Sequence, residues 1–441
     1  MAYIGWLVRR QEADYARFQE MKRVVENQTF YEGTTVEGVD VSTMTLRAAL
    51  EYWRQRVEPG YSDRTVTLDD GTTLTAVDMG YTSDYESVLS NVWSAGRRGS
   101  LESRYRAAVS HQENPVAYRV TRVLYDEVLI GDYVDALAEQ IDQPAQDAAV
   151  KGFNMKKLSF TFTDAQNGRK LNAKALKESI ATTLQAGSGS VTREIETISP
   201  TVTAKALKKQ FGRITTATTN ASSSSANRLS NIKTALKYIN GTCLEPGETF
   251  SFNKTVGKRT TDRGFKIATA YSGGDVTEEV GGGICQVATT LFNAAVKADL
   301  KIVERHNHSL TVAYVDSGKD ATVNWGSQDL RFKNTSGEKL YIVCFLSDDK
   351  RVRVGIFGKL LPNGETITVE AETTEVIEYE TEYQRTDQLE RGKQELVSNG
   401  KQGCKAVAYK VRWDSKGKEL SREVLCKSWY KAKNEVVAVG A

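Results

Sequence analysis

The sequence predicts a multidomain α+β protein with two small α+β modules, a central α+β domain and an extended all-β C-terminal domain. The first observation behind this prediction is the length of 441 residues, which exceeds one hydrophobic core and suggests about three domains. The second is that threonine- and valine-rich segments alternate with short helical patterns, as is typical of α+β folds. The third is that the end of the chain, residues 369–441, has strand patterns alone.

The charge and the N-terminal segment limit the possible partners. Lys and Arg number 59 and Asp and Glu 56, so the nearly balanced charge of the whole chain gives no electrostatic reason to expect a nucleic-acid partner. The apolar segment 2–8 is much shorter than the roughly 20 residues that span a bilayer. It predicts that residues 1–30 form an N-terminal helix or the remainder of a membrane-anchor stalk, with anchorage through a segment upstream of residue 9. A short buried or interfacial piece of a cytosolic protein is the alternative.

Two stretches of similar pattern predict the two α+β modules. The first has a short strand at 36–42, followed by a helix whose apolar side chains recur at helical spacing over 46–53. The second has an alternating strand at 158–162 and a helix that Asn172 can cap. A polar low-complexity run at 215–225 then predicts a linker or a long loop.

A hairpin is predicted near the C-terminus. Two alternating stretches, 407–413 and 419–425, flank a turn at 414–418. In a hairpin centred near position 415, Cys404 and Cys426 fall almost opposite each other, which predicts a cross-strand disulfide. Closing such a loop stabilises a protein by about 3 kcal/mol in the chain-entropy model. The disulfide would favour an oxidising compartment, and two reduced thiols are the alternative.

The stretch 281–295 is the most informative part of the sequence. Three consecutive glycines permit backbone angles that other residues avoid, and they run into an apolar pattern with helical spacing. Cys285 is therefore predicted in the first turn of a helix, where free N–H groups and the helix dipole stabilise a thiolate. The alternative is a helix start that packs closely against another backbone, with Cys285 as a small core residue.

Two of the three histidines of the chain lie close together downstream of this helix. In a strand, His306 and His308 would share one face. Cys285 could then be a nucleophile with one imidazole as its base and Asp320 to orient that imidazole. Cys285, His306 and His308 could instead bind zinc. In the third alternative the histidines are structural and are hydrogen-bonded on a domain surface.

Five motifs in this order resemble the VanW family, which is named for a vancomycin-resistance gene cluster. They are Gly247-Glu-Thr-Phe-Ser-Phe-Asn253, Gly281-Gly-Gly-Ile-Cys-Gln-Val287 with Thr289-Thr-Leu-Phe-Asn-Ala294, Arg305-His-Asn-His-Ser309, Gly318-Lys-Asp-Ala321 and Asp329-Leu-Arg-Phe-Lys-Asn334. The resemblance covers about residues 212–346. It identifies a domain rather than a reaction.

The flanking regions resemble modules of bacterial surface proteins. Residues 369–441 look like the G-five domain, with glycines at 392, 400, 403, 417 and 440. Residues 31–210, with a possible break near 145–155, look like the peptidoglycan-binding modules that often precede VanW domains; the stretch Val36-Glu-Gly-Val-Asp-Val-Ser-Thr-Met-Thr45 carries this resemblance. The resemblance implies peptidoglycan or another cell-wall glycan as partner. It implies an extracellular protein of a Gram-positive bacterium, anchored to the wall or the membrane.

Two functions are compatible with these observations. The first is a wall-associated binding protein whose VanW domain binds a wall-related ligand in a groove near Cys285. The second is a cysteine-dependent enzyme of peptidoglycan metabolism that uses Cys285 with His306 or His308 for acyl or peptide-bond chemistry. No cofactor is expected for either. The residues expected to line the groove are Gly281, Gly282, Gly283, Gln286, Thr289, Asn293 and Arg305.

Overall fold

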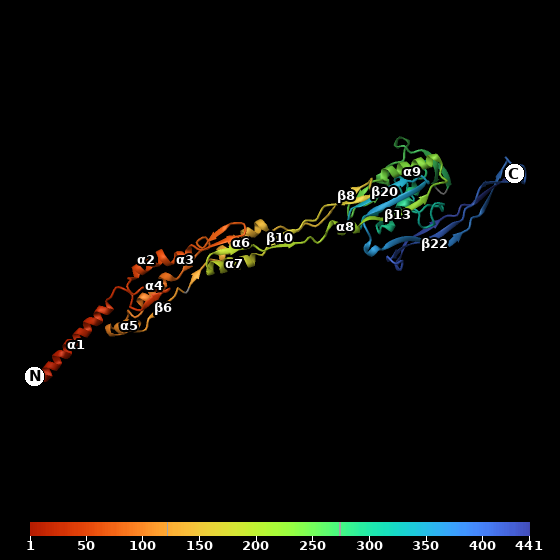
Figure 1. Cartoon of the computed structure of the whole chain (residues 1–441). Coiled ribbons are helices and arrows are strands. Elements are labelled where there is room, and N and C mark those ends of the chain that lie inside the picture. The colour runs from red at the N-terminus through yellow and green to blue at the C-terminus, as the bar shows by residue number, and fades with distance from the viewer. Residues whose placement is uncertain (121, 273–274) are drawn as a thin grey trace. The chain divides into compact units, whose positions relative to one another are not determined.

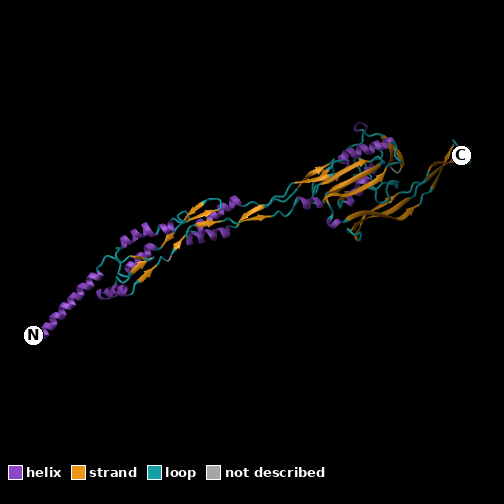
Figure 2. Cartoon of the chain, viewed as in Figure 1, coloured by secondary structure: helices purple, strands orange, loops and turns teal. Residues whose placement is uncertain are grey.

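The computed structural model describes residues 1–120, 122–272 and 275–441 (Figure 1). The chain forms two compact units, and each unit combines two segments of the sequence. The first unit contains residues 1–146 and 166–200, and the second contains residues 147–165 and 201–441. Both units mix helices and strands, whereas the described residues after 365 form strands without a helix (Figure 2). The predicted multidomain α+β class with an all-β end is confirmed.

The first unit begins with a long helix and continues with short strands and helices. Its elements are α1 Ala2–Val25, β1 Thr34–Val36, β2 Val39–Asp40, α2 Leu46–Tyr52 with a π-helical turn Trp53–Val57, α3 Pro59–Ser62, β3 Thr65–Leu68, β4 Thr73–Thr75, β5 Thr82–Ser83, α4 Tyr85–Ser94, α5 Leu101–Glu113, β6 Val116–Tyr118, β7 Val123–Leu124, α6 Glu127–Ile141, β10 Gly168–Leu171, α7 Ala173–Ala186, β11 Gly189–Val191 and β12 Ile195–Ile198. None of the helices in the described part of the chain has the length and apolar character needed to cross a bilayer.

This unit has two hydrophobic cores. One surrounds Trp53 and Leu89, and the other surrounds Val66 and Ile180. The second core joins distant parts of the sequence, because β3 pairs with β11 in parallel. The predicted cap of α7 is confirmed, since the side chain of Asn172 accepts a hydrogen bond from the backbone N–H of the third helical residue.

The second unit contains the central domain and a C-terminal β domain. The elements of the central domain are β8 Val150–Asn154, β9 Ser159–Phe162, α8 Ala204–Gln210, β13 Phe211–Asn220, α9 Ala226–Ile239, β14 Cys243–Leu244, β15 Thr249–Ser251, α10 Phe252–Val256, a 3₁₀ turn Thr261–Arg263, β16 Ile267–Ser272, β17 Asp275–Val280, α11 Ile284–Lys297, β18 Lys301–Glu304, β19 Arg331–Lys333, β20 Leu340–Leu346, β21 Arg351–Lys359 and a 3₁₀ turn Pro362–Gly364. Four strands form an antiparallel sheet in the order β13-β21-β20-β14. Helix α9 lies against this sheet (Figure 1), and α11 is the most buried helix of the domain.

The predicted linker at 215–225 is wrong for its first half. Residues 211–220 form β13, which pairs with β21 along its whole length. Ala217 and Thr219 of this strand are buried, and the Thr219 hydroxyl lies 2.8 Å from the hydroxyl of Thr290 on α11. Low complexity hid the strand, because threonine is a good strand residue and the small side chains pack closely against a helix.

The C-terminal β domain, defined as residues 366–441, consists of two three-stranded sheets, β22-β25-β26 and β23-β27-β24. Its elements are β22 Thr366–Ile377, β23 Thr381–Thr386, β24 Gln394–Ser398, β25 Gly403–Trp413, β26 Glu419–Tyr430 and β27 Glu435–Gly440. The predicted hairpin is confirmed, with β25 and β26 joined by a turn in which Gly417 has a φ of 82°.

The predicted disulfide is wrong. Two register irregularities in the hairpin shift the strands, so that Cys404 lies opposite Tyr430 and Cys426 lies opposite Ala408. The Cys404 sulfur lies 3.4 Å from the Ser317 hydroxyl, and the Cys426 sulfur donates to the Gly318 carbonyl at 3.5 Å. All five cysteines, each within the described residues, carry free thiols.

Candidate active site

The glycine run before α11 has the role that the sequence predicts. Gly281 and Gly283 have φ angles of 98° and 104°, in the left-handed region that favours glycine. A Cβ atom on Gly282 would lie 2.4 Å from the Ala268 carbonyl oxygen. The buried side chain of Asn231 on α9 donates to the Gly282 carbonyl at 3.0 Å. Only glycines fit this turn, and the turn sets where α11 begins.

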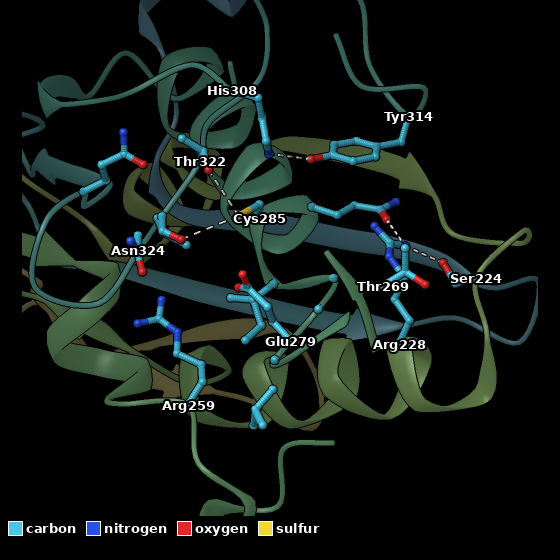
Figure 3. A pocket seen from close by; sticks show the side chains of 18 of the residues that line it. Ser224, Arg228, Arg259, Thr269, Glu279, Cys285, His308, Tyr314, Thr322 and Asn324 are labelled. Carbon is cyan, nitrogen blue, oxygen red and sulfur yellow. Dashed lines mark hydrogen bonds between the residues drawn. The ribbon is translucent and has the colours of Figure 1, made fainter. Parts of the chain in front are cut away.

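Cys285 is the second residue of α11 and is partly buried. Its sulfur lies 3.4 Å from the Thr322 hydroxyl and donates to the Val323 carbonyl at 3.6 Å. The sulfur also lies on the wall of a cavity of about 1060 Å³ (Figure 3). The N–H groups of the first turn of a helix favour negative charge, so this position suits a thiolate.

His308 and Asp320 reach the same place from the loop between β18 and β19. Both side chains are buried. His308 Nδ1 lies 2.6 Å from Asp320 Oδ2, and the His308 backbone N–H donates to the same oxygen at 2.7 Å. This pair leaves His308 Nε2 to face the cavity, where the Tyr314 hydroxyl lies 3.5 Å away. Figure 3 shows the His308 ring reaching into the cavity that Cys285 lines.

Cys285, His308 and Asp320 shift one another's pKa values. Burial alone would raise the pKa of the Cys285 thiol, but His308 and Thr322 outweigh it and lower that pKa to about 7. Burial alone would lower the pKa of His308, but hydrogen bonds and charges from Asp320 and Cys285 outweigh it and raise that pKa to about 9. Between about pH 7 and pH 9 the arrangement therefore favours a thiolate beside an imidazolium.

The cavity carries several polar side chains that the sequence did not single out. They include Arg228, Arg259, Glu279, Tyr314 and Asn324 (Figure 3). Arg259 has one guanidinium nitrogen, Nη2, that is buried without a hydrogen-bond partner among the described residues, whereas its Nη1 donates to Asn253 at 2.7 Å. No spacing pattern in the sequence marks these residues, because they come from the helix α9, the strand β17 and separate loops.

His306 does not join Cys285. The strand β18 ends at Glu304, so the period of two that would place both histidines on one face does not extend to them. His306 Nε2 lies 3.1 Å from Glu304 Oε1, and His306 lines a different cavity. The prediction of His306 as a partner of the thiol is corrected, and so is the zinc alternative, which needed both histidines beside Cys285.

Three residues expected in the groove bind the protein itself. The Thr289 hydroxyl and the Asn293 amide, both on α11, bond backbone atoms of the loop at Ala321 and Lys319. Arg305 donates to the carbonyl and the carboxylate of Asp320. These expectations are corrected, because the three side chains fix the loop that carries Asp320 and are absent from the described lining of the cavity.

The glycines and Gln286 do line the cavity. The Gln286 amide is saturated by protein partners, however. Its nitrogen donates to Asn220 and Thr219, and its oxygen accepts from Arg228 at 2.9 Å. Gln286 therefore orients Arg228 toward the cavity.

Comparison with known families gives three matches along the chain. Residues 72–193 match the family described as "Putative peptidoglycan binding domain", residues 227–357 match the family described as "VanW like protein", and residues 368–441 match the G5 domain. The predicted resemblances are thus confirmed in kind and in order. Domains of these kinds indicate a cell-wall-associated protein.

Individual relatives agree with these matches. The chain is 48% identical over 120 residues to the uncharacterized protein YoaR of Bacillus subtilis and 30% identical over 141 residues to the vancomycin B-type resistance protein VanW of Enterococcus faecalis. The matches cover 27% and 31% of this chain, and the chain spans only 40% and 51% of the length of these relatives. The solved G5 domain of an IgA1 protease is 25% identical, with 18% of this chain and 95% of that structure covered and a TM-score of 0.14. Residues 227–357 therefore form a VanW-like domain, which follows a region that matches a peptidoglycan-binding family and precedes a G5 domain.

Proposed function

We propose that the VanW domain is a cysteine-dependent enzyme that transfers acyl groups of peptidoglycan peptides. The observation that carries this proposal is that Cys285 and His308 line one cavity, while the buried Asp320 bonds the far nitrogen of the His308 ring. The proposal assigns wall binding to residues 31–210 and 369–441 and the chemistry to residues 212–346. Attachment to the membrane through a segment upstream of residue 9 stays a prediction from the sequence.

The chemistry follows from the protonation states of the pair. The Cys285 thiolate attacks a peptide carbonyl carbon, and a carbon–sulfur bond forms while negative charge moves to the oxygen. His308 gives its Nε2 proton to the leaving amine, and the carbon–nitrogen bond breaks to leave a thioester. The neutral imidazole then takes a proton from an attacking amine or water, whose nitrogen or oxygen forms a bond to the acyl carbon. The carbon–sulfur bond breaks, and the thiolate and the imidazolium return.

Surrounding groups support each part of this cycle. Asp320 holds His308 in the tautomer that presents Nε2 to the cavity. The N–H groups at the start of α11 supply positive dipole near the carbonyl oxygen as its charge develops. The cavity of about 1060 Å³ offers room for a peptide.

Arg259 is expected to bind a carboxylate of the substrate. A partly buried guanidinium with one nitrogen, Nη2, that lacks a hydrogen-bond partner among the described residues fits a carboxylate better than a neutral group, and peptides carry carboxylates. Arg259→Gln should raise KM about tenfold with a smaller change in kcat, because a charge-assisted hydrogen bond contributes about 1.5–3 kcal/mol. Steady-state kinetics on a muropeptide would measure this.

The matched control for Arg259 is its neighbour Lys258, which also lines the cavity but is exposed. Lys258→Gln removes the same charge without a buried guanidinium and should change KM less. Equal effects of both variants would point to general attraction by positive charge and would contradict a specific carboxylate contact.

Product analysis tests the proposed function. The protein is incubated with purified muropeptides before and after alkylation with iodoacetamide, and mass spectrometry identifies cleaved or joined peptides. We expect products from the untreated protein, loss of products after alkylation, and unchanged binding to sacculi in both. The same experiment in a Cys243→Ala protein lacks the exposed thiol, so that a loss of products after alkylation cannot result from modification of Cys243. Sacculus binding without products from the untreated protein would instead support a domain that only binds its ligand.

A further inference from the structure

The C-terminal β domain contacts the carboxylate of Asp320 directly. The side chain of Tyr430, at the end of β26, is fully buried and donates its hydroxyl hydrogen to Asp320 Oδ1. The same hydroxyl accepts from the Gly318 backbone N–H at 2.6 Å. Tyr430 therefore bonds two groups of the segment 318–320, the Gly318 backbone N–H and the carboxylate of Asp320, which is the partner of His308.

Other residues of the same β domain bond the loop on either side of this contact. Arg305 donates to Asp320 Oδ1 at 3.0 Å and to the hydroxyl of Ser428, on β26, at 2.8 Å. The Lys431 backbone N–H donates to the Ser309 carbonyl, and the Lys401 ammonium donates to the Thr311 carbonyl. The loop between β18 and β19 thus has many of its polar groups satisfied by residues 401–431 rather than by the VanW domain.

We propose that Tyr430 is a positioning residue for Cys285, His308 and Asp320, so that the C-terminal β domain completes the active site as well as any wall-binding surface it carries. This inference rests on the proposed function for its catalytic meaning. Its structural content, an ordered Asp320–His308 pair that depends on Tyr430, is testable without a substrate.

The inference rests on the separate hydrogen-bond donors of the two Asp320 carboxylate oxygens. Asp320 Oδ1 accepts from Tyr430 and Arg305, and Oδ2 accepts from the backbone and the ring of His308. Donors on both oxygens fix the plane of the carboxylate, and that plane fixes the ring of His308. Without the Tyr430 hydroxyl, a buried carboxylate loses a donor that no water can readily replace, and the ring loses part of its support.

The test is the pH dependence of Cys285 alkylation, read at Cys285 by peptide mass spectrometry with iodoacetamide as the probe. In the otherwise unchanged protein the midpoint should lie near pH 7. Tyr430→Phe should move it by about one unit toward the ordinary thiol value, about 8.5, and slow alkylation at pH 7 several-fold. Tyr409→Phe is the matched control, because that hydroxyl bonds Glu372 on the exposed surface of the same domain; its midpoint should not move.

Each outcome is decisive. A lower melting temperature with an unmoved midpoint in Tyr430→Phe would show a purely structural tyrosine and would overturn the inference. If Tyr430→Phe does not fold, Ser428→Ala removes the outer support of Arg305 and should shift the midpoint in the same direction by less; an unmoved midpoint there also overturns it. A shifted midpoint in a protein that forms no products from muropeptides would retain this inference and reject the proposed function.

Discussion

Cys285→Ala is expected to abolish product formation from muropeptides, with a loss of at least about 10⁴-fold, and His308→Ala is expected to slow it by about 10²–10⁴-fold. The first variant lacks the atom that forms the thioester. The second lacks the proton donor for the leaving amine and also the charge that lowers the pKa of the thiol. Initial rates measured by chromatography of the products would give both values.

The pH dependence of the reaction follows from the same pair. Below about pH 7 the Cys285 thiolate gains a proton and the rate should fall. Above about pH 9 His308 loses the proton that the leaving amine needs, and the rate should fall again. The acid and alkaline limbs of the pH–rate profile both reflect the coupled Cys285–His308 pair rather than either residue alone. His308→Ala should therefore change both limbs.

His306 provides the matched control for His308. It lies two positions away in the sequence but bonds Glu304 and lines another cavity. His306→Ala should leave the rate within about twofold, because substitutions away from a site have small effects. A loss as large as that of His308→Ala would contradict the assignment of His308.

Gly282→Ala is expected to cause the second large loss, through packing rather than chemistry. The new Cβ would lie 2.4 and 2.5 Å from the carbonyl oxygens of Ala268 and Thr269, and backbone atoms cannot turn aside as a flexible side chain can. Overpacking typically costs about 1–3 kcal/mol and occasionally more, so the melting temperature should fall by about 5 °C or more. Because the turn sets the start of α11, the rate should fall further than the stability alone requires.

Gly212 provides the control for this substitution. It lies on β13 in the same domain, and a Cβ there would meet only the Leu360 side chain at an ordinary 3.7 Å. Gly212→Ala should leave both the melting temperature and the rate nearly unchanged. A Gly282→Ala protein as stable and active as Gly212→Ala would contradict the close packing of the glycine turn.

Local patterns predicted the helix that carries Cys285 and the glycines before it, because both depend on residues adjacent in sequence. Asn172 as a helix cap and the C-terminal hairpin were predictable for the same reason. His308 and Asp320, which the sequence offers as candidate partners of Cys285, lie in one hydrogen-bonded pair, and His308 lines the same cavity as Cys285. Their geometry was not predictable from spacing.

The predictions that were wrong, and the residue that was missed, depend on contacts between distant parts of the chain. His306 and His308 seemed equivalent because the end of β18 at Glu304 is set by pairing with β19, not by local propensity. The predicted disulfide is wrong because irregularities in the pairing of β25 with β26 shift one strand along the other, so that the two cysteines are not opposite each other. Tyr430 lies 110 residues from Asp320 in sequence, and nothing in its own surroundings marks it as a partner.

The most direct test of the proposed function is a search for an acyl group on Cys285. The protein is mixed with a muropeptide, quenched with acid and measured by intact mass, followed by peptide mapping. We expect a mass increase equal to an acyl fragment of the muropeptide, located at Cys285, absent from Cys285→Ala and removed by hydroxylamine as a thioester should be. Products formed by Cys285→Ala at the rate of the unchanged protein, with no adduct at Cys285, would contradict the proposal.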